Sequence, residues 1–354
     1  MIARPLAEHF RRLLGPAGVI DDPAAMAPYG VDRTTRYRPA PGLVVRPATV
    51  EEVAAVVRLA RAEGLPLVPS GGRTGYAGGA VAAAGEVVVS LERMRRIAHF
   101  SPQDAAVTCE AGVVTAELQA FAERQNLFYP VDLASAGSCQ IGGNAATNAG
   151  GVHVIRYGGT REQVTGLTVV TGTGEVLRLN RGLVKNNAGP DLRHLFVGSE
   201  GILGILCEVT VRLAPPRPPQ WVLLAAAPDV EALLAFAAAA RRALVLSACE
   251  FFSEAALQRV RARSGLAHPF ARPAPLYGLL EFDAPPDGGE VEELFAAARS
   301  NGWLEDAVLA TEPGPGAPAV AACGKRSPRP WPPRGPSSST SPCASSAWPS
   351  WAGA

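Results

Sequence analysis

The chain has 354 residues, of which 47% are hydrophobic, and its formal net charge is +1. This length predicts two or three domains with sizeable cores. A net charge near zero argues against a nucleic-acid partner and against attraction to an anionic membrane.

No apolar run reaches 18 residues, so we expect no transmembrane segment. The first twenty residues lack a continuous apolar stretch and predict a short amphipathic helix, not a secretory signal. Six cysteines form no CxxC pair and five histidines no HExxH motif, so we expect no metal site and a reducing compartment. We expect a cytoplasmic protein, with peripheral attachment to the inner face of the membrane as the alternative.

The clearest pattern along the chain is a β-α-β unit near its start. Residues 43–45 predict a strand, Thr49 caps a helix that Gly64 ends, and residues 65–70 predict a second, parallel strand. Further elements follow in order: strands at 86–91 and 106–112, a helix at 114–125, a hairpin over 167–179 and a strand at 202–214.

The proline-rich stretch at 214–220 predicts a domain boundary. After it we expect strands at 221–227, 243–251, 276–282 and 305–311, with helices at 230–243 and 288–302. This order favours an antiparallel sheet backed by helices, and an α+β protein as a whole.

The composition changes after Glu312. The remaining residues contain no Leu, Ile, Phe, Asp or Glu, are rich in Pro and Ser, and include Trp331, Trp348 and Trp351. No apolar face can be drawn at either period, which predicts disorder. The tryptophans are unusual for a natural disordered tail.

A first glycine-rich loop, "PSGGRTGYAGGA", directly follows the predicted strand at 65–70. Its spacing matches neither a P-loop nor GxGxxG. Glycines let backbone N–H groups converge on an anion, so the loop suits a phosphate; isolated tight turns are the alternative.

The second run, "GSCQIGGNAATNAGG" at 137–151, has almost no side-chain bulk and is a poor helix or strand sequence. Small residues allow a flat or extended ligand to approach the backbone, while Asn and Thr can bond to it. Two such loops could hold the two halves of a dinucleotide such as FAD.

These two runs, with "VVRPATVEEV" and "DLRHLFVGSEGILGILCEVTVRL", fall in the order found in FAD-binding PCMH-type (vanillyl-alcohol oxidase-like) flavoproteins. Within these the chain most resembles the D-2-hydroxyacid dehydrogenase group. The resemblance is dense over residues 1–220 and weaker to about residue 320. It implies a helical segment at 1–38, an FAD-binding PCMH-type domain at 39–216, a partial substrate or cap domain at 217–312 and a non-native tail at 313–354.

The resemblance implies that FAD is bound by both glycine runs and by the segment around residue 201. The implied cofactor residues are Ser70, Gly71, Gly72, Arg73, Thr74, Gly75, Gly78, Gly79, Asp132, Ser138, Ile141, Gly142, Gly143, Asn144, Thr147, Asn148, Gly150, Gly151, Gly201 and Ile205. Relatives with covalent flavin usually carry His where this chain has Arg73, so we expect non-covalent FAD. Ile202 replaces the family's usual Thr.

The resemblance also implies oxidation of D-lactate, glycolate or D-2-hydroxyglutarate to the 2-oxo acid, with hydride passing to flavin N5 and electrons to a protein or quinone. The oligomeric state is not implied. Relatives carry their substrate and base residues in the C-terminal part, where this chain reads "GKRSPRPW" in place of a helix resembling "LREAISEAL". We therefore expect a frameshifted end, leave the catalytic residues unassigned, and keep an FAD-binding fragment without activity as the alternative.

Other candidate residues have plainer interpretations. His153 and Arg156 could face the substrate, or could be packing or surface residues. Cys139 reads as a small, inert buried thiol. The stretch Lys185–Asn187 resembles a family motif and is read as a structured turn, with cofactor contact as the less favoured role. A purely structural module, with both glycine loops as empty turns, is the remaining alternative.

Overall fold

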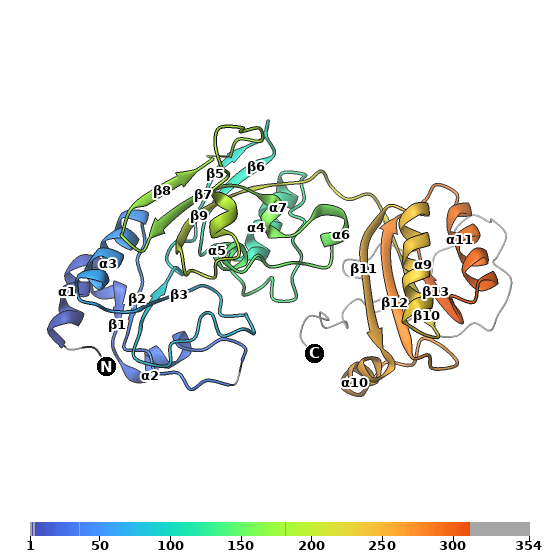
Figure 1. The fold of residues 1–354 in the computed structure, drawn as a ribbon, viewed down its shortest axis with the longest axis horizontal. Coiled ribbons are helices and arrows are strands. Elements are labelled where there is room, and N and C mark those ends of the chain that lie inside the picture. Colours follow the sequence, from blue (N-terminus) through green and yellow to red (C-terminus); the bar gives the residue numbers. More distant parts are fainter. Residues whose placement is uncertain (1, 3, 35, 181, 312–354) are drawn as a thin grey trace. The chain divides into compact units, whose positions relative to one another are not determined.

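The computed structural model describes residues 2, 4–34, 36–180 and 182–311, and the predicted tail at 313–354 lies outside them. The chain packs as two units (Figure 1). The first holds the residues up to Gly151 together with Gly158–Pro216, and the second holds Val152–Tyr157 and the chain from Arg217 onward.

A small, mostly parallel sheet carries the first glycine loop. Its strand order is β1-β2-β4-β3, and the strands are β1 (Val19–Ile20), β2 (Leu43–Val45), β3 (Leu67–Ser70) and β4 (Val87–Ser90). The expected β-α-β unit is confirmed: β2 and β3 are both parallel to β4, which lies between them.

Helix α3 (Val50–Ala62) connects β2 to β3 and begins as the sequence predicts. The Thr49 side chain accepts a hydrogen bond from the Glu52 N–H at 3.1 Å. Gly64, at φ +63°, follows the end of the helix. The predicted N-terminal helix is α1 (Arg4–Leu14), which buries Ala7, Phe10 and Leu14 in the core that α3 also lines.

The second sheet of this unit is antiparallel, with strand order β5-β6-β9-β7-β8. Its strands are β5 (Ile97–Ser101), β6 (Ala106–Glu110), β7 (Val164–Thr171), β8 (Val176–Leu179) and β9 (Gly204–Arg212). The predicted hairpin is β7 with β8, and Gly174 takes φ +80° in its turn. Sequence patterning missed β5, which has a mixed burial pattern.

Further helices lie between the strands of the first unit along the chain. They are α2 (Pro23–Met26), α4 (Thr115–Arg124), α5 (Ile141–Ala146), α7 (Thr160–Gln163) and α8 (Arg193–Phe196), with 3₁₀ turns at Pro16–Gly18 and Ala27–Tyr29. Helix α5 corrects one expectation, because the second glycine run does form a helix. Burial of Ile141 and Ala145 in the core overrides its poor intrinsic propensity.

The second unit is an antiparallel sheet, as expected, with strand order β11-β12-β10-β13. The strands are β10 (Gln220–Ala227), β11 (Leu246–Ser253), β12 (Leu276–Asp283) and β13 (Asp306–Ala310). The predicted helices are α9 (Val230–Ala243) and α11 (Gly289–Ser300), and the sequence reading missed α10 (Glu254–Ser264).

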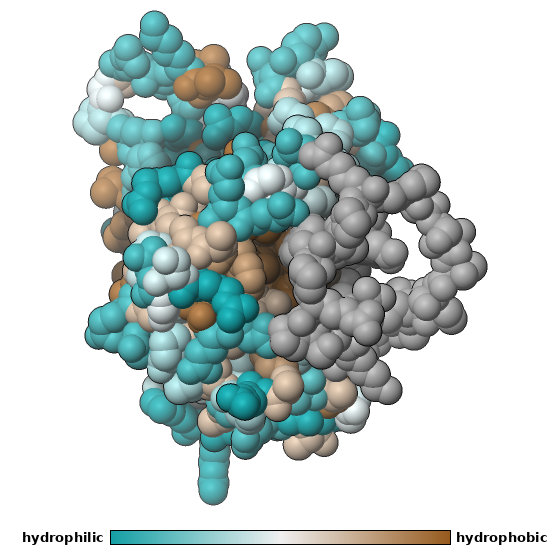
Figure 2. All heavy atoms as spheres, turned by 90° about the vertical axis from the view of Figure 1, so that its right-hand side faces the viewer, coloured by the Kyte–Doolittle hydropathy of each residue, from teal (hydrophilic) through white to brown (hydrophobic). Residues whose placement is uncertain are grey.

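The helices of the second unit are amphipathic. Leu233 of α9 and Leu294 of α11 pack with Leu223 and Leu280 of the sheet, while Leu257 of α10 packs with Tyr277 in a second cluster. Figure 2 shows hydrophilic side chains over much of one face, with apolar ones gathered nearer the middle of the view. Helix α6 (Val154–Tyr157) belongs to this unit although it follows the second glycine run in the chain.

Within the part of the chain that the structure describes, no helix is long and apolar enough to cross a membrane.

Candidate cofactor site

The first glycine loop begins at the carboxyl end of β3 and is held at several points along its length. The Leu91 N–H donates to the Ser70 carbonyl at 3.1 Å, and the Gly75 carbonyl accepts from the Arg33 N–H at 2.9 Å. Near the far end, the Gly78 N–H donates to Asp32 Oδ2 at 2.8 Å. The loop is therefore held through the carbonyls of Ser70 and Gly75 and through the N–H of Gly78.

The backbone donors in the middle of the loop are left for a ligand. Among the described residues, the N–H groups of Gly72, Arg73, Thr74 and Gly75 donate to no protein acceptor. A Cβ added at Gly75 would have no atom within 4 Å. Consecutive unpaired N–H groups next to open space suit the oxygens of a pyrophosphate.

Arg73 takes an unusual backbone conformation in this loop, with φ +55°. Its side chain turns back onto its own loop, where Nη1 lies 3.3 Å from Ser70 Oγ and 3.2 Å from the Gly71 carbonyl. The guanidinium carbon also lies 4.7 Å from the centre of the Tyr29 ring. The backbone N–H groups of the loop therefore stay unpaired among the described residues, and Arg73 places a positive charge near them.

The glycines of the second run serve two different purposes. A Cβ added at Gly142 would lie 2.4 Å from Ala111 Cβ, and one added at Gly151 would lie 2.3 Å from the Asp132 carbonyl oxygen. These two glycines permit close packing of backbone on protein. A Cβ added at Gly143 has no neighbour within 4 Å, so Gly143 alone of these three borders open space.

The two glycine runs meet. A Cβ added at Gly71 would lie 3.3 Å from Gln140 Oε1 and 3.7 Å from Gly143 Cα, and one at Gly72 would lie 2.2 Å from the Ser138 carbonyl oxygen. The structure thus brings the unpaired donors of the first loop beside the open face of α5.

The segment around residue 201 closes on the same loop. A Cβ added at Gly79 would lie 3.0 Å from Glu200 Oε2, and one at Gly201 would lie 2.9 Å from Pro69 Cγ. All three stretches that the sequence singled out therefore lie together, although they are distant in the chain.

The amide and hydroxyl side chains of the second run are used largely within the protein. Asn144 Nδ2 donates to Thr115 Oγ1 at 2.7 Å, and Thr147 Oγ1 donates to the Gly143 carbonyl at 2.9 Å. Asn148 Oδ1 accepts from the Arg161 N–H at 3.0 Å. These observed bonds shape the loop, and contact of the same three residues with a ligand stays a prediction.

Three other predicted residues pack within the protein. Ile141 and Ile205 have buried side chains in two hydrophobic clusters of the first unit. The Asp132 backbone packs against Gly151 at the end of the second run.

Sequence reasoning missed Gln140. Its Oε1 is buried beside Gly71 and, within the described ranges, has no hydrogen-bond partner. A buried acceptor without a partner is costly and indicates a ligand or water donor in the complete site. Its position just before the first glycine pair of the second run was the available signal.

Backbone strain also gathers here. Arg73, Asn148 and Glu200 have φ values of +55°, +48° and +52°, in the left-handed region that non-glycine residues rarely adopt. Each lies in one of the three converging segments. Such conformations cluster where a binding site requires them.

The remaining candidates have other surroundings. Cys139 is buried and its Sγ lies 3.1 Å from Thr115 Oγ1, as suits an inert thiol. Burial raises the pKa of Cys109 and of Cys207 to about 12, so these thiols stay protonated at neutral pH. No group of His, Cys, Asp or Glu that could hold a metal ion occurs in the described part of the chain.

His153 and Arg156 lie within the second unit. Arg156 pairs with Asp283, and His153 Nε2 lies 3.3 Å from Glu281 Oε1 and 2.9 Å from Arg217 Nη1. Both side chains lie against carboxylates of β12, which favours the packing interpretation.

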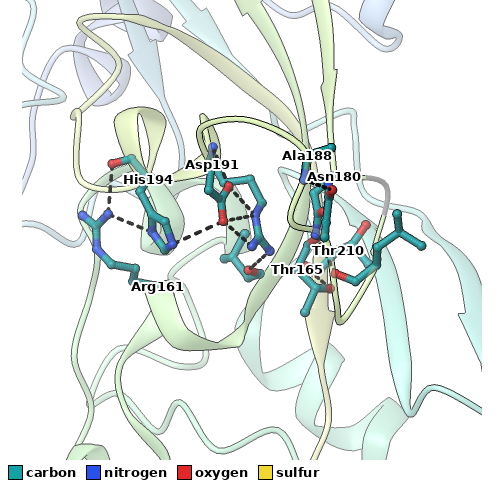
Figure 3. Close-up of polar contacts among 11 residues, drawn as sticks. Arg161, Thr165, Asn180, Ala188, Asp191, His194 and Thr210 are labelled. Carbon is teal, nitrogen blue, oxygen red and sulfur yellow. Dashed lines mark hydrogen bonds and ion pairs between the residues drawn. The ribbon is translucent and has the colours of Figure 1, made fainter.

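The stretch at Lys185–Asn187 lies in an exposed, irregular segment of the first unit. Asn186 bonds to Asn180 Oδ1 at 2.8 Å, and its own Oδ1 accepts from the Ala188 N–H at 3.1 Å. Asn180 in turn donates to the Thr165 carbonyl at 2.7 Å (Figure 3). These side-chain bonds order the segment, but residues 185–187 form no regular turn.

Comparison with known proteins adds independent information. Residues 41–180 match the family model of the FAD binding domain, and residues 218–328 match that of the FAD linked oxidases, C-terminal domain. The second match runs to residue 328, past residue 320, to which the sequence reading extended the resemblance.

The chain is similar to D-2-hydroxyglutarate dehydrogenases. It is 49% identical to that of Xanthomonas citri over 81% of this chain and 61% of the relative, and 46% identical to that of Stutzerimonas stutzeri over 86% and 66%. The mitochondrial enzyme of Bos taurus is 37% identical over 84% of this chain and 55% of its own length. The chain thus spans less than two thirds of these curated relatives.

Solved structures agree on the fold. An alkyldihydroxyacetonephosphate synthase has a TM-score of 0.71 at 18% identity, covering 92% of this chain and 63% of that one. A p-cresol methylhydroxylase with substrate bound has a TM-score of 0.71 at 18% identity, covering 86% and 65%. With both domain matches, the chain belongs to the FAD linked oxidases that combine an FAD binding domain with this C-terminal domain, and its cofactor is FAD.

Proposed function

We propose that the two glycine runs hold FAD non-covalently, with the pyrophosphate on the first loop and the ring system along α5. The observation that carries this proposal is the unpaired N–H row of Gly72–Gly75 lying beside the open face at Gly143. The buried acceptor of Gln140 supports it, because FAD offers hydrogen-bond donors. Arg73 has no nucleophilic atom for a covalent flavin bond.

The proposed reaction is oxidation of a D-2-hydroxy acid to the 2-oxo acid. FAD, when bound, supplies the hydride acceptor for such a reaction. D-2-hydroxyglutarate is the first candidate substrate, because two D-2-hydroxyglutarate dehydrogenases are 49% and 46% identical to this chain. D-lactate and glycolate are the alternatives within the group, and a protein or quinone is the proposed electron acceptor.

Cofactor binding is tested by spectroscopy of the purified full chain. We expect flavin absorption bands in the blue and near ultraviolet, and release of the flavin into the supernatant after acid precipitation. Flavin that stays with the acid precipitate would contradict non-covalent attachment. A colourless protein that added FAD does not reconstitute would contradict the placement of the site.

Substrate identity is tested by anaerobic bleaching of the bound flavin. We expect D-2-hydroxyglutarate to bleach it faster than D-lactate or glycolate, and L-2-hydroxyglutarate to leave it oxidised. Bound flavin that none of the D-acids reduces would contradict the proposed reaction and would favour a cofactor-binding fragment. Turnover with a dye acceptor then measures the rate.

A further inference from the structure

Arg161 joins two of the three segments that converge on the proposed cofactor site. Its backbone N–H donates to Asn148 Oδ1 at 3.0 Å. Its guanidinium donates through Nη1 to the His194 carbonyl at 3.0 Å (Figure 3). It also donates through Nη2 to the Val197 carbonyl at 2.6 Å. One residue of α7 therefore contacts both the end of the second glycine run and the chain leading to Gly201.

The segment that Arg161 holds also closes helix α5. Directly after Val197, the Gly198 N–H donates to the Ala145 carbonyl at 3.0 Å, and the Glu200 N–H donates to the Ala146 carbonyl at 2.8 Å. The Glu200 bond satisfies a carbonyl at the end of the helix, and the Ala145 carbonyl also accepts from the Asn148 N–H at 3.1 Å. A displacement of Val197 would therefore reach the helix whose open face borders the proposed flavin position.

Strained backbone lies on both sides of this contact. Asn148 and Glu200 have positive φ, and such conformations persist only where their surroundings fix them. A planar guanidinium can bond two carbonyls at once in a fixed geometry, whereas an ammonium is a compact point donor. Arginine thus suits this position better than lysine.

His194 keeps the guanidinium in place. Its Nδ1 lies 3.3 Å from Arg161 Nη1, and because a guanidinium only donates, this nitrogen is the acceptor. The proton of a neutral imidazole is then on Nε2, which lies 3.5 Å from Asp191 Oδ2. Hydrogen bonds from Arg193 lower the pKa of Asp191, so this carboxylate stays charged (Figure 3).

We propose that Arg161 is a positioning residue for the FAD site, which holds the Asn148 turn and the 197–201 segment in the conformation that receives the ring system. It acts through these segments and not by touching the reacting atoms. The inference rests on the proposed placement of FAD along Gly143–Gly151.

The test compares Arg161→Ala and Arg161→Lys with the parent chain. Apoprotein is titrated with FAD by fluorescence quenching, and the visible circular dichroism of the bound flavin is recorded at saturation. We expect Arg161→Ala to raise the Kd for FAD at least about tenfold, as loss of charged hydrogen bonds implies, and to change the dichroism. The Kd of Arg161→Lys for FAD should lie between those of the parent and of Arg161→Ala, because lysine restores the lost contacts only in part.

Arg58→Ala is the matched control, because its guanidinium also donates to a backbone carbonyl, that of Gly174 at 2.8 Å, outside the three converging segments. We expect it to lower the denaturant midpoint while leaving the Kd and the dichroism of bound flavin unchanged. Exposed Arg178→Ala should change neither.

The inference is overturned if Arg161→Ala or Arg161→Lys binds FAD with the parent's Kd and dichroism. It is equally overturned if Arg58→Ala weakens FAD as much as Arg161→Ala does, since the role would then be general stability. If Arg161→Ala does not fold, the lysine variant decides. Failure of the parent chain itself to bind FAD would instead refute the proposed function.

Discussion

The two glycine-rich runs of the first unit look alike in the sequence and differ in the structure. In the first, the backbone N–H groups of Gly72–Gly75 have no protein acceptor, and Gly75 borders open space. In the second, a helix forms, and Gly142 packs against Ala111 so tightly that no side chain fits. Only Gly143 of that helix's glycine pair borders open space.

The comparison separates two reasons for a glycine. One reason is a ligand that must approach the backbone, and the other is protein that already occupies the place of the side chain. Substitutions distinguish these cases, because the first kind should change FAD affinity while the second should change the stability of the protein without cofactor.

The largest effect is expected for Gly142→Ala. The new Cβ would lie 2.4 Å from Ala111 Cβ and 3.0 Å from the Ala111 carbonyl oxygen, so the helix or β6 must move. We expect the free energy of unfolding of the apoprotein to fall by about 3 kcal/mol, measured by urea denaturation. Gly137→Ala, with open space around it, is the control. Equal stability of Gly142→Ala and the parent would refute this packing.

Gly143 should behave in the opposite way. Its helical backbone and open surroundings accept a side chain, so Gly143→Ala should stabilise the apoprotein by up to about 1 kcal/mol. The same position borders the proposed ring system, so Gly143→Val should weaken FAD about a hundredfold or more. Thermal unfolding and FAD titration measure the two effects. Stoichiometric flavin in Gly143→Val would mean that the cofactor lies elsewhere.

A smaller effect is expected at the far end of the first loop. Asp32 accepts hydrogen bonds from the Gly78 N–H and the Thr34 N–H, both at 2.8 Å. Asp32→Ala should loosen the loop and raise the Kd for FAD about tenfold, because bonds to a charged acceptor are lost. Asp104→Ala, in the turn between β5 and β6, is the control. An unchanged Kd in Asp32→Ala would show that the loop does not need this anchor.

The smallest effect that we expect is a dependence of the stability of the second unit on pH. Burial raises the pKa of Asp283, but hydrogen bonds from Arg156 and Gln220 outweigh it, and the net pKa lies below the ordinary value. Burial likewise raises the pKa of Glu281, and bonds from His153 with the charge of Arg217 lower it overall.

Lowered carboxyl pKa values stabilise the folded state above the unfolded-state values near 4, and this contribution disappears as pH falls through the folded-state values. We expect Asp283→Asn to remove about 1 kcal/mol of the stability of the second unit at pH 7 and less at pH 3. Urea midpoints at the two pH values measure this. Glu293→Gln, on the exposed side of α11, is the control, and a loss in Asp283→Asn that is the same at both pH values would contradict the assignment.

Much of the fold could be predicted from local patterns. The cap at Thr49, the hairpin of β7 with β8, and the helical period of α9 are properties of short segments, and the structure confirms each. Strand β5 and helix α10 were missed because neither has a clear apolar face, and α10 buries only Leu257. Helix α5 was missed because its stability comes from the core that it joins.

The sequence by itself determined which segments are too small to fill a core, and its motif order indicated the flavoprotein family. Only the tertiary structure decided which of those glycines face open space, because a Cβ collides with residues that are distant in the chain, as Gly151 does with Asp132. It also placed Gln140 beside Gly71 and Arg161 beside Asn148, where we propose roles for both. Neither residue type signals a cofactor locally, and their roles arise from long-range contacts with Gly71, His194 and Val197.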